Sequence, residues 1–375
     1  MKRRHAKQSR SNRRRIRYAL IGLGHIAQAA VLPGFRNARR NSSLVAVVSG
    51  NTKKRRAMAT RYGIPSYSYE QYDELLASGT VDAIYLTLPN HLHRSYVERA
   101  LRAGIHVLCE KPLGLTETDC RAMARAAKRA KLMVAYRLHF DEANLRMIEL
   151  ARSGRLGQVR IFHSLFTQNV RAGDTRLEAD MGGGPLLDIG IYCINAARYL
   201  FQAEPIEVFA AASRTKDARF REVAEMHAVT MRFSEDRLAT FVSSFGAADR
   251  AEYDLIGTKG TARLESAYAY SQGMRAWITI GDRTKSIRYP RRDQFGPQVL
   301  YFSDCILHAR APEPSALEGT LDVAIIEALE RSAATGRVVQ IRSKEAPPHR
   351  PGLSQLFRCP AVPPPLLVDS TAPTR

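Results

Sequence analysis

The sequence predicts an α/β protein of two domains. A doubly wound parallel sheet comes first, and an α+β domain with a large, mostly antiparallel open sheet follows. A chain of 375 residues with 45% apolar content is long enough for two cores, because single cores stop growing near ~250 residues. Before residue 140 short apolar runs alternate with helical patterns, which indicates parallel strands joined by helices. After it, period-two segments indicate antiparallel strands with one polar face.

The first domain is expected over residues 16–140. Its five apolar runs are typical of strands buried on both faces. In order they are YALIGLG (18–24), LVAVVSG (44–50), VDAIYLTLP (81–89), IHVLCEKP (105–112) and LMVAYRL (132–138). The helical patterns RRAMATRYG, YDELLASG, SYVERALRAG and TDCRAMARAAKRA lie between them.

The second domain is expected over residues 141–343. Alternating segments predict its strands: VRIFHSLFT (159–167), PIEVFAAASR (205–214), AEMHAVTMRF (224–233), LATFVSSFG (238–246), AEYDLIG (251–257), TARLES (261–266) and AWITIG (276–281). A helix near residues 320–335 and a final strand, RVVQIR (337–342), complete it.

The N-terminal end is predicted to be a disordered basic tail, and the C-terminal end a disordered or loosely attached one. Residues 1–15 hold eight Lys or Arg and no acid, a large part of the net charge of +21. Such an arm could contact nucleic acid weakly, although a solvated extension is the simpler interpretation. Residues 344–375 are rich in proline and lack periodicity.

The sequence predicts a cytoplasmic protein without a membrane span or a metal. No apolar run approaches the ~18 residues that cross a bilayer, and the basic N-terminal stretch lacks the apolar region of a signal peptide. The five cysteines are scattered and have no metal-ligand spacing. His163, His227 and His308 stand singly, as structural histidines do.

The stretch GLGHIA indicates a dinucleotide site. A strand runs into Gly22 and Gly24 and then into a helical pattern, so backbone amides and a helix N-terminus can meet a pyrophosphate. Ala27 stands where a third glycine is common, and alanine is small enough for close helix-to-strand packing. This predicts a Rossmann domain.

The end of the second strand favours NADP over NAD. NAD enzymes usually place Asp or Glu there for the ribose 2′-hydroxyl, whereas this chain has Ser49 followed by the cations at 53–56. A hydroxyl and a lysine suit a 2′-phosphate. Part of the cationic run must be a solvated helix start, and NAD stays an alternative.

Two later stretches carry chemically reactive groups. Lys111, in Cys109-Glu110-Lys111-Pro112, lies at the carboxyl end of a parallel strand, where ligands bind in this architecture. In GGGPLLDIGIYCINAARYL, Asp188 and Tyr192 lie four apart, on one helical face. By themselves they would be a capping acid and a core tyrosine.

Together these stretches resemble the Gfo/Idh/MocA family of glucose-fructose oxidoreductases and inositol dehydrogenases. The resemblance covers about residues 17–342 and rests on GLGHIA, LPNHLH, EKP, AYRLHF and GGGPLLDIGIY in this order. Within the family, SGNTKK and DIGIYCINAARYL are most similar to the glucose-fructose oxidoreductase group.

The resemblance implies a catalytic set of Lys111, Asp188 and Tyr192. Lys111 matches the lysine that contacts the reacting hydroxyl and the nicotinamide ribose, and Asp188 matches the substrate-binding acid. Tyr192 stands where the glucose-fructose group has tyrosine and inositol dehydrogenases have histidine. We expect Tyr192 to take the proton of the substrate hydroxyl, with Lys111 assisting.

The resemblance also implies the contacts of cofactor and substrate. Ser49 and Lys54 fall where the glucose-fructose group binds the 2′-phosphate. The cofactor residues are Gly22, Gly24, His25, Ile26, Ala27, Ser49, Lys54, Arg55, Leu88, Pro89, Asn90, His93, Glu110 and Lys111. The substrate residues are Lys111, Arg137, His139, Asp188 and Tyr192.

The expected activity is NADP-dependent hydride transfer between a sugar, or a sugar-derived polyol, and the nicotinamide. One alternative is a simple NAD(P)-dependent dehydrogenase of another polyol or cyclic alcohol. Another is a non-catalytic regulator that senses cofactor and sugar. The exposed face of the second sheet predicts a homodimer or homotetramer. The sequence does not separate a cofactor that stays bound from one that exchanges each turnover.

Overall fold

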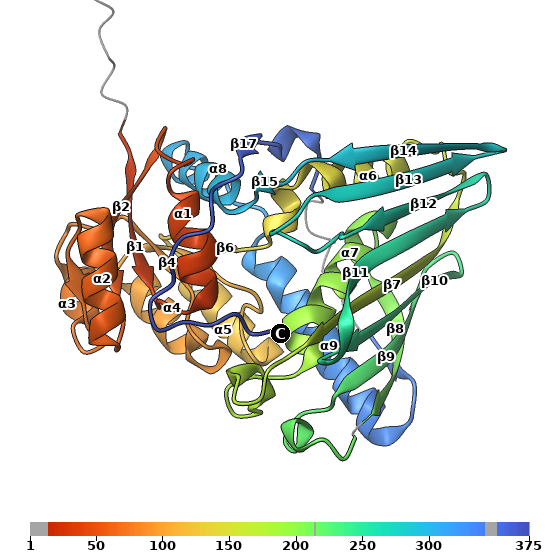
Figure 1. The fold of residues 1–375 in the computed structure, drawn as a ribbon, viewed down its shortest axis with the longest axis horizontal. Helices are drawn as coiled ribbons and strands as arrows, with labels where there is room; N and C mark the ends of the chain where they lie inside the picture. Colours follow the sequence, from red (N-terminus) through yellow and green to blue (C-terminus); the bar gives the residue numbers. More distant parts are fainter. Residues whose placement is uncertain (1–13, 214, 342–350, 375) are drawn as a thin grey trace, which may run out of the picture.

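The structure is a computed structural model that describes residues 14–213, 215–341 and 351–374. The predicted basic tail therefore lies almost wholly outside the described residues. The chain forms two lobes side by side (Figure 1).

The first lobe contains the predicted parallel sheet, in the order β3-β2-β1-β4-β5-β6. Its strands are β1 (Ile16–Ile21), β2 (Ser42–Val48), β3 (Ser66–Tyr67), β4 (Ala83–Leu86), β5 (His106–Cys109) and β6 (Leu132–Val134). Its helices are α1 (Leu32–Gly34), after a π-helical turn over Ala27–Val31, α2 (Thr52–Tyr62), α3 (Tyr72–Ala77), α4 (His93–Arg102) and α5 (Glu117–Ala126). The doubly wound fold class is confirmed.

The second lobe is built on a nine-stranded sheet, in the order β14-β13-β12-β11-β7-β10-β9-β8-β16. The strands are β7 (Val159–Asn169), β8 (Pro205–Ser213), β9 (Met226–Phe233), β10 (Arg237–Ser244), β11 (Gly246–Gly257), β12 (Gly260–Glu265), β13 (Met274–Ile280), β14 (Arg283–Tyr289) and β16 (Val339–Gln340). The pair β7–β10 is parallel and the other pairs are antiparallel, so the sheet is mixed. Helices α6 (Glu142–Arg152), α7 (Ile191–Phe201) and α9 (Ala316–Thr335) pack on one face of it.

Helix α8 (Phe295–Leu307) lies within the range expected for the second domain but packs on the first sheet. Val299 and Phe302 are buried in the same core as β1 and β2. The hydroxyls of Ser303 and Tyr18 are 2.8 Å apart. The chain thus returns to the first lobe late in its sequence (Figure 1).

A buried ionic network fixes α7, the helix that carries Tyr192. The Arg198 guanidinium is fully buried and donates to Glu204 through Nε, at 2.6 Å, and through a terminal nitrogen, at 2.9 Å. It also donates to Glu318 and Asp322 of α9. This network holds α7 on α9.

Arg198→Met is expected to lower the free energy of unfolding by about 3 to 5 kcal/mol, because it leaves the buried carboxylates of Glu318 and Asp322 without the cation that neutralises them. Chemical denaturation measures the change. Arg121→Met is the matched control, since the Arg121–Glu117 pair of α5 lies on the surface and should contribute below ~1 kcal/mol. An equal loss of unfolding free energy in the two variants would contradict the stabilising role of the buried Arg198 network.

The C-terminal segment departs from the expectation of disorder over 344–375. Residues 351–374 pack along the molecule, with a 3₁₀ turn at Leu353–Gln355 and a short strand β17 (Cys359–Pro360) paired with β15 (Arg292–Asp293). These residues contact backbone groups and side chains of distant segments of the folded body. Such contacts require no regular spacing of apolar residues, so the sequence shows no periodicity here. Proline content therefore gave a wrong prediction for this stretch.

Candidate active site

The phosphate turn has the shape that the sequence predicts. Gly22 has φ +96°, and a Cβ there would lie 2.7 Å from the Thr87 carbonyl oxygen, so only glycine fits. A Cβ on Gly24 would meet nothing within 4 Å, so this backbone is open to a ligand. Ala27 is fully buried against the sheet, as expected of a packing position.

Lys111 meets Asp188 at the junction of the lobes. Lys111 follows β5, and its Nζ donates to Asp188 Oδ1 at 2.8 Å and to the Asp188 carbonyl at 2.6 Å. The other carboxylate oxygen, Oδ2, accepts from Arg176 Nε at 2.7 Å. The carboxylate is thus held between two cations.

These contacts keep the three groups charged. Burial raises the pKa of Asp188, but Lys111 and Arg176 outweigh it and hold that pKa well below its usual range. Burial lowers the pKa of Lys111, and Asp188 raises it to a net value above the ordinary one. Lys111 is therefore an ammonium at neutral pH, a hydrogen-bond donor rather than a base.

Tyr192 is flanked by two cations. Its ring centroid lies 5.0 Å from Lys111 Nζ and 4.9 Å from the guanidinium carbon of Arg137. Among the described residues, the Tyr192 hydroxyl makes no hydrogen bond, and it is not enclosed. The phenol can therefore form a hydrogen bond with a ligand in the cavity.

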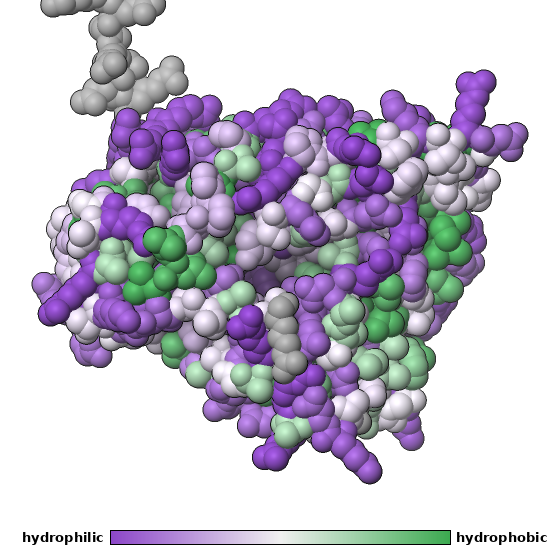
Figure 2. Space-filling view, in the orientation of Figure 1, coloured by the Kyte–Doolittle hydropathy of each residue, from purple (hydrophilic) through white to green (hydrophobic). Residues whose placement is uncertain are grey.

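These groups share one cavity of about 940 Å³ with the phosphate turn. Figure 2 shows a hollow at the centre of this face. From the predicted set, the cavity is lined by Gly24, His25, Ile26, Leu88, Pro89, Asn90, Glu110, Lys111, Arg137, Asp188 and Tyr192. The volume suits a small ligand beside a nicotinamide.

Other predicted residues lie outside this cavity. Ser49 directly follows β2, whereas Lys54 and Arg55 lie in the first turn of α2. Arg55 donates to the Ser49 carbonyl at 2.9 Å. His93 is fully buried, with its two ring nitrogens 2.9 Å from the Leu88 and Pro112 carbonyl oxygens. It supports the turn around the cavity rather than facing it. His139 is also buried, against Asn195 of α7.

Arg176 is the main site residue that sequence reasoning missed. It lies in a 3₁₀ turn (Thr175–Leu177) after β7, lines the cavity and binds both Asp174 and Asp188. Burial lowers its pKa, but the two carboxylates raise it above the ordinary value. The segment RAGDTRLEAD has no periodicity, so only a count of charges near Asp188 could have pointed to it.

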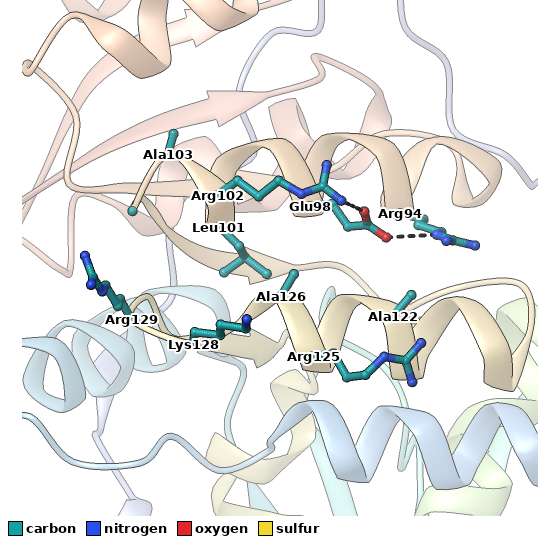
Figure 3. Close-up of a pocket in the computed structure, with 11 residues that line it drawn as sticks. Arg94, Glu98, Leu101, Arg102, Ala103, Ala122, Arg125, Ala126, Lys128 and Arg129 are labelled. Carbon is teal, nitrogen blue, oxygen red and sulfur yellow. Dashed lines mark hydrogen bonds and ion pairs between the residues drawn. The ribbon is translucent and has the colours of Figure 1, made fainter.

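A second cavity of about 1040 Å³ lies between α4 and α5 (Figure 3). Arg94 and Arg102 bind Glu98 there. It holds none of the predicted site residues. Within the described ranges, no group of His, Cys, Asp and Glu could hold a metal, and no helix is long and apolar enough to cross a membrane.

Family models match both lobes. Residues 16–138 match an oxidoreductase family with an NAD-binding Rossmann fold, and residues 144–263 match the GFO/IDH/MocA C-terminal domain. The chain belongs to the Gfo/Idh/MocA oxidoreductase family. It is therefore an oxidoreductase with a dinucleotide-binding first lobe.

Relatives in the Gfo/Idh/MocA family match over nearly their whole length. An uncharacterized oxidoreductase of Rhizobium meliloti is 34% identical over 86% of this chain and 98% of its own. A D-xylose 1-dehydrogenase [NADP(+)] of Haloarcula marismortui is 27% identical over 87% and 93%. The aldose-aldose oxidoreductase structure from Caulobacter crescentus, complexed with glycerol, has a TM-score of 0.83 and 37% identity, and covers 88% of this chain and all of its own.

Proposed function

We propose that the chain is an NADP-dependent oxidoreductase that transfers hydride between an aldose and the nicotinamide, with aldoses as both donor and acceptor. The observation that carries the proposal is the meeting of Lys111, Asp188 and Tyr192 in one cavity with the phosphate turn. The resemblance to an aldose-aldose oxidoreductase and to an NADP-dependent xylose dehydrogenase supports the substrate class.

The first lobe fits a dinucleotide. The backbone at Gly24 is open, because a Cβ there would meet nothing within 4 Å, and His25 lines the same cavity with a buried Nδ1 that has no hydrogen-bond partner among the described residues. Ser49 follows β2 and Lys54 lies at the start of α2, and both can bind a phosphate through their side chains. Residues 49–56 contain no carboxylate. This chemistry suits a 2′-phosphate and supports NADP.

The chain's own groups position the sugar and move its proton. When bound, the nicotinamide supplies the hydride acceptor at its C4. Lys111 donates a hydrogen bond to the reacting oxygen, and Asp188 orients Lys111 and accepts from a neighbouring sugar hydroxyl. In the oxidation step the phenolate form of Tyr192 takes the proton of the reacting hydroxyl and becomes the phenol, while hydride leaves the carbon that carries this hydroxyl. When an aldose is reduced, the phenol returns this proton. Arg176 and Arg137 hold Asp188 and Tyr192 in place.

The test is a panel of aldoses mixed with the protein and NADP or NAD, followed by the absorbance of the reduced nicotinamide. Reduction of NADP by an aldose is expected, with NAD reduced more slowly. No reduction with glucose, xylose or other aldoses would contradict the proposal. Reduction that occurs only with polyols or cyclic alcohols would favour a simple dehydrogenase of such alcohols.

The exposed face of the nine-stranded sheet is proposed as the contact between two copies of the chain. Ile256, Ile161 and Leu238 lie directly opposite one another across β11, β7 and β10, and each is about 40% exposed. Phe209 of β8, 38% exposed, lies on the far side of β9 from this row. A row of exposed branched side chains on a broad sheet is typical of a homodimer interface.

Ile161→Glu, at the centre of this row, is expected to convert a dimer into monomers, because it buries a charge in the interface. Sedimentation velocity measures the change. Val338→Glu is the matched control, since Val338 is also exposed but lies outside the row. A monomeric wild type, or a variant that stays dimeric, would rule out this interface.

A further inference from the structure

The C-terminal segment over residues 366–374 crosses from one lobe to the other. Figure 1 shows it running past α1 and ending between the two lobes. At its start, Arg61 of α2 donates to the Leu366 carbonyl at 2.8 Å. We name residues 366–374 the strap.

On the first lobe, the strap binds the helix that follows the phosphate turn. Gln28 and Val368 form a reciprocal pair: Gln28 Nε2 donates to the Val368 carbonyl at 3.0 Å, and the Val368 amide donates to Gln28 Oε1 at 2.8 Å. Gln28 Nε2 also donates to the Leu23 carbonyl, at 2.9 Å, within the turn itself. The strap is thus joined to the phosphate turn through one buried amide.

Asp369 of the strap binds the first turn of α2, which follows β2. Lys53 Nζ donates to Asp369 Oδ1 at 2.8 Å. The pKa of Asp369 is lowered by this bond and further by the charges of Lys53 and Lys54 and a bond from Asn51. The strap therefore lies beside the groups proposed to bind the 2′-phosphate.

On the second lobe, the strap pairs with the end of β7. The Arg171 amide donates to the Pro373 carbonyl at 2.9 Å, and Arg171 Nε donates to the Thr374 carbonyl at 2.9 Å. Thr374 also forms an antiparallel bridge with Val170. Backbone bonds at both ends make the strap a span between the lobes.

The strap covers the site without filling it. Ala372, Pro373 and Thr374 line the same cavity as Lys111 and Tyr192. A Cβ on Gly24 still meets nothing within 4 Å, so the phosphate turn stays open beneath the strap. Gly24, His25 and Ile26 of the phosphate turn line this cavity together with the strap.

We propose that the strap holds the dinucleotide in its site between turnovers. A dinucleotide that reaches from Lys111 past the phosphate turn to Ser49 and Lys54 would run alongside the strap. The strap binds Gln28 and Lys53 and lines the cavity through Ala372, Pro373 and Thr374. Release then requires the bonds at Gln28, Lys53 and Arg171 to open. This inference rests on the proposed function and deepens it, because a retained cofactor passes hydride from one aldose to another.

The experiment measures release of NADPH without sugar, so it does not depend on the proposed reaction. Protein loaded with NADPH is mixed with excess NADP⁺, and nicotinamide fluorescence follows the loss. Deletion of residues 366–375 is expected to speed release by about tenfold or more, since several hydrogen bonds no longer oppose it. Asp369→Asn, which keeps the shape and weakens the ion pair, should give a smaller increase of the same sign.

Leu366→Ser is the matched control within the strap. Its side chain is 83% exposed, so release should equal that of the full chain. Unchanged release in both the deletion and Asp369→Asn would overturn the proposal. Slower release of NADPH from Asp369→Asn would overturn it too, and would show that Asp369 competes with the 2′-phosphate.

A second measurement uses aldose-to-aldose transfer in the presence of an enzyme that consumes free NADPH. The full chain should keep transferring hydride between aldoses. The deletion variant should release NADPH to the consuming enzyme, so its transfer between aldoses should fall. An equal fall in aldose-to-aldose transfer in the full chain and the deletion variant would contradict retention of the cofactor by the strap. If no aldose reduces the cofactor, the proposed function fails, while the release rates still decide the role of the strap.

Discussion

Lys111→Met is expected to lower the rate of hydride transfer by about 10³-fold, in the range for loss of a charged group at a reacting oxygen. Methionine keeps the apolar stem and removes the ammonium that binds Asp188. Arg176 still pairs with that carboxylate, so the variant should fold. The rate comes from single-turnover absorbance of the reduced nicotinamide after an aldose is mixed with the NADP-loaded protein.

The control for Lys111 is Lys128→Met, which removes an exposed lysine far from Asp188. It should transfer hydride at the rate of the unaltered chain. Thermal melting and NADP binding of Lys111→Met establish that fold and cofactor site persist. A Lys111→Met rate within about twofold of the unaltered rate would remove Lys111 from the chemistry.

Tyr192→Phe is expected to slow hydride transfer by about 10² to 10⁴-fold, the contribution typical of a positioned acid-base group. Phenylalanine keeps the ring between Lys111 and Arg137 and removes only the hydroxyl. Asp188 has a lowered pKa and Lys111 a raised one, so neither titrates near neutrality. Single-turnover absorbance of the reduced nicotinamide measures the rate, and an unaltered rate would remove the Tyr192 hydroxyl from proton transfer.

Tyr270→Phe is the control for this variant. Tyr270 also lines the cavity, and the Arg137 guanidinium carbon lies 5.4 Å from its ring centroid. Tyr270 has no assigned part in proton transfer, so Tyr270→Phe should slow hydride transfer far less than Tyr192→Phe. If Tyr270→Phe is as slow as Tyr192→Phe, the effect comes from disturbed packing of the cavity rather than from a lost proton acceptor.

Buried strands and glycine turns could be predicted because their cause is local. Apolar runs such as VDAIYLTLP can only be buried, and the turn at Gly22 tolerates no side chain. The parallel sheet and the family followed from these features and are confirmed. Strand β14, RTKSIRY, was missed because most of its side chains are exposed, so its sequence shows no buried face.

Contacts between distant segments could not be predicted, because the sequence around one partner carries no information about the identity of the other. Arg176 is one arginine among many until the fold places it 2.7 Å from Asp188. The strap is similar: its backbone bonds to Gln28 and Arg171 depend on no side chain of its own. The proline-rich composition of residues 344–375 suggested disorder, whereas tertiary hydrogen bonds hold the strap in place.

The most direct test of the account is transfer of deuterium from an aldose labelled at C1. Protein carrying stoichiometric NADP is mixed with the labelled aldose, and the reduced nicotinamide is analysed by mass spectrometry. The account predicts deuterium in the nicotinamide, slower transfer than with unlabelled sugar, and passage of the label to a second aldose. Absence of the label from the nicotinamide, or its transfer at an unaltered rate in Lys111→Met and Tyr192→Phe, would contradict it.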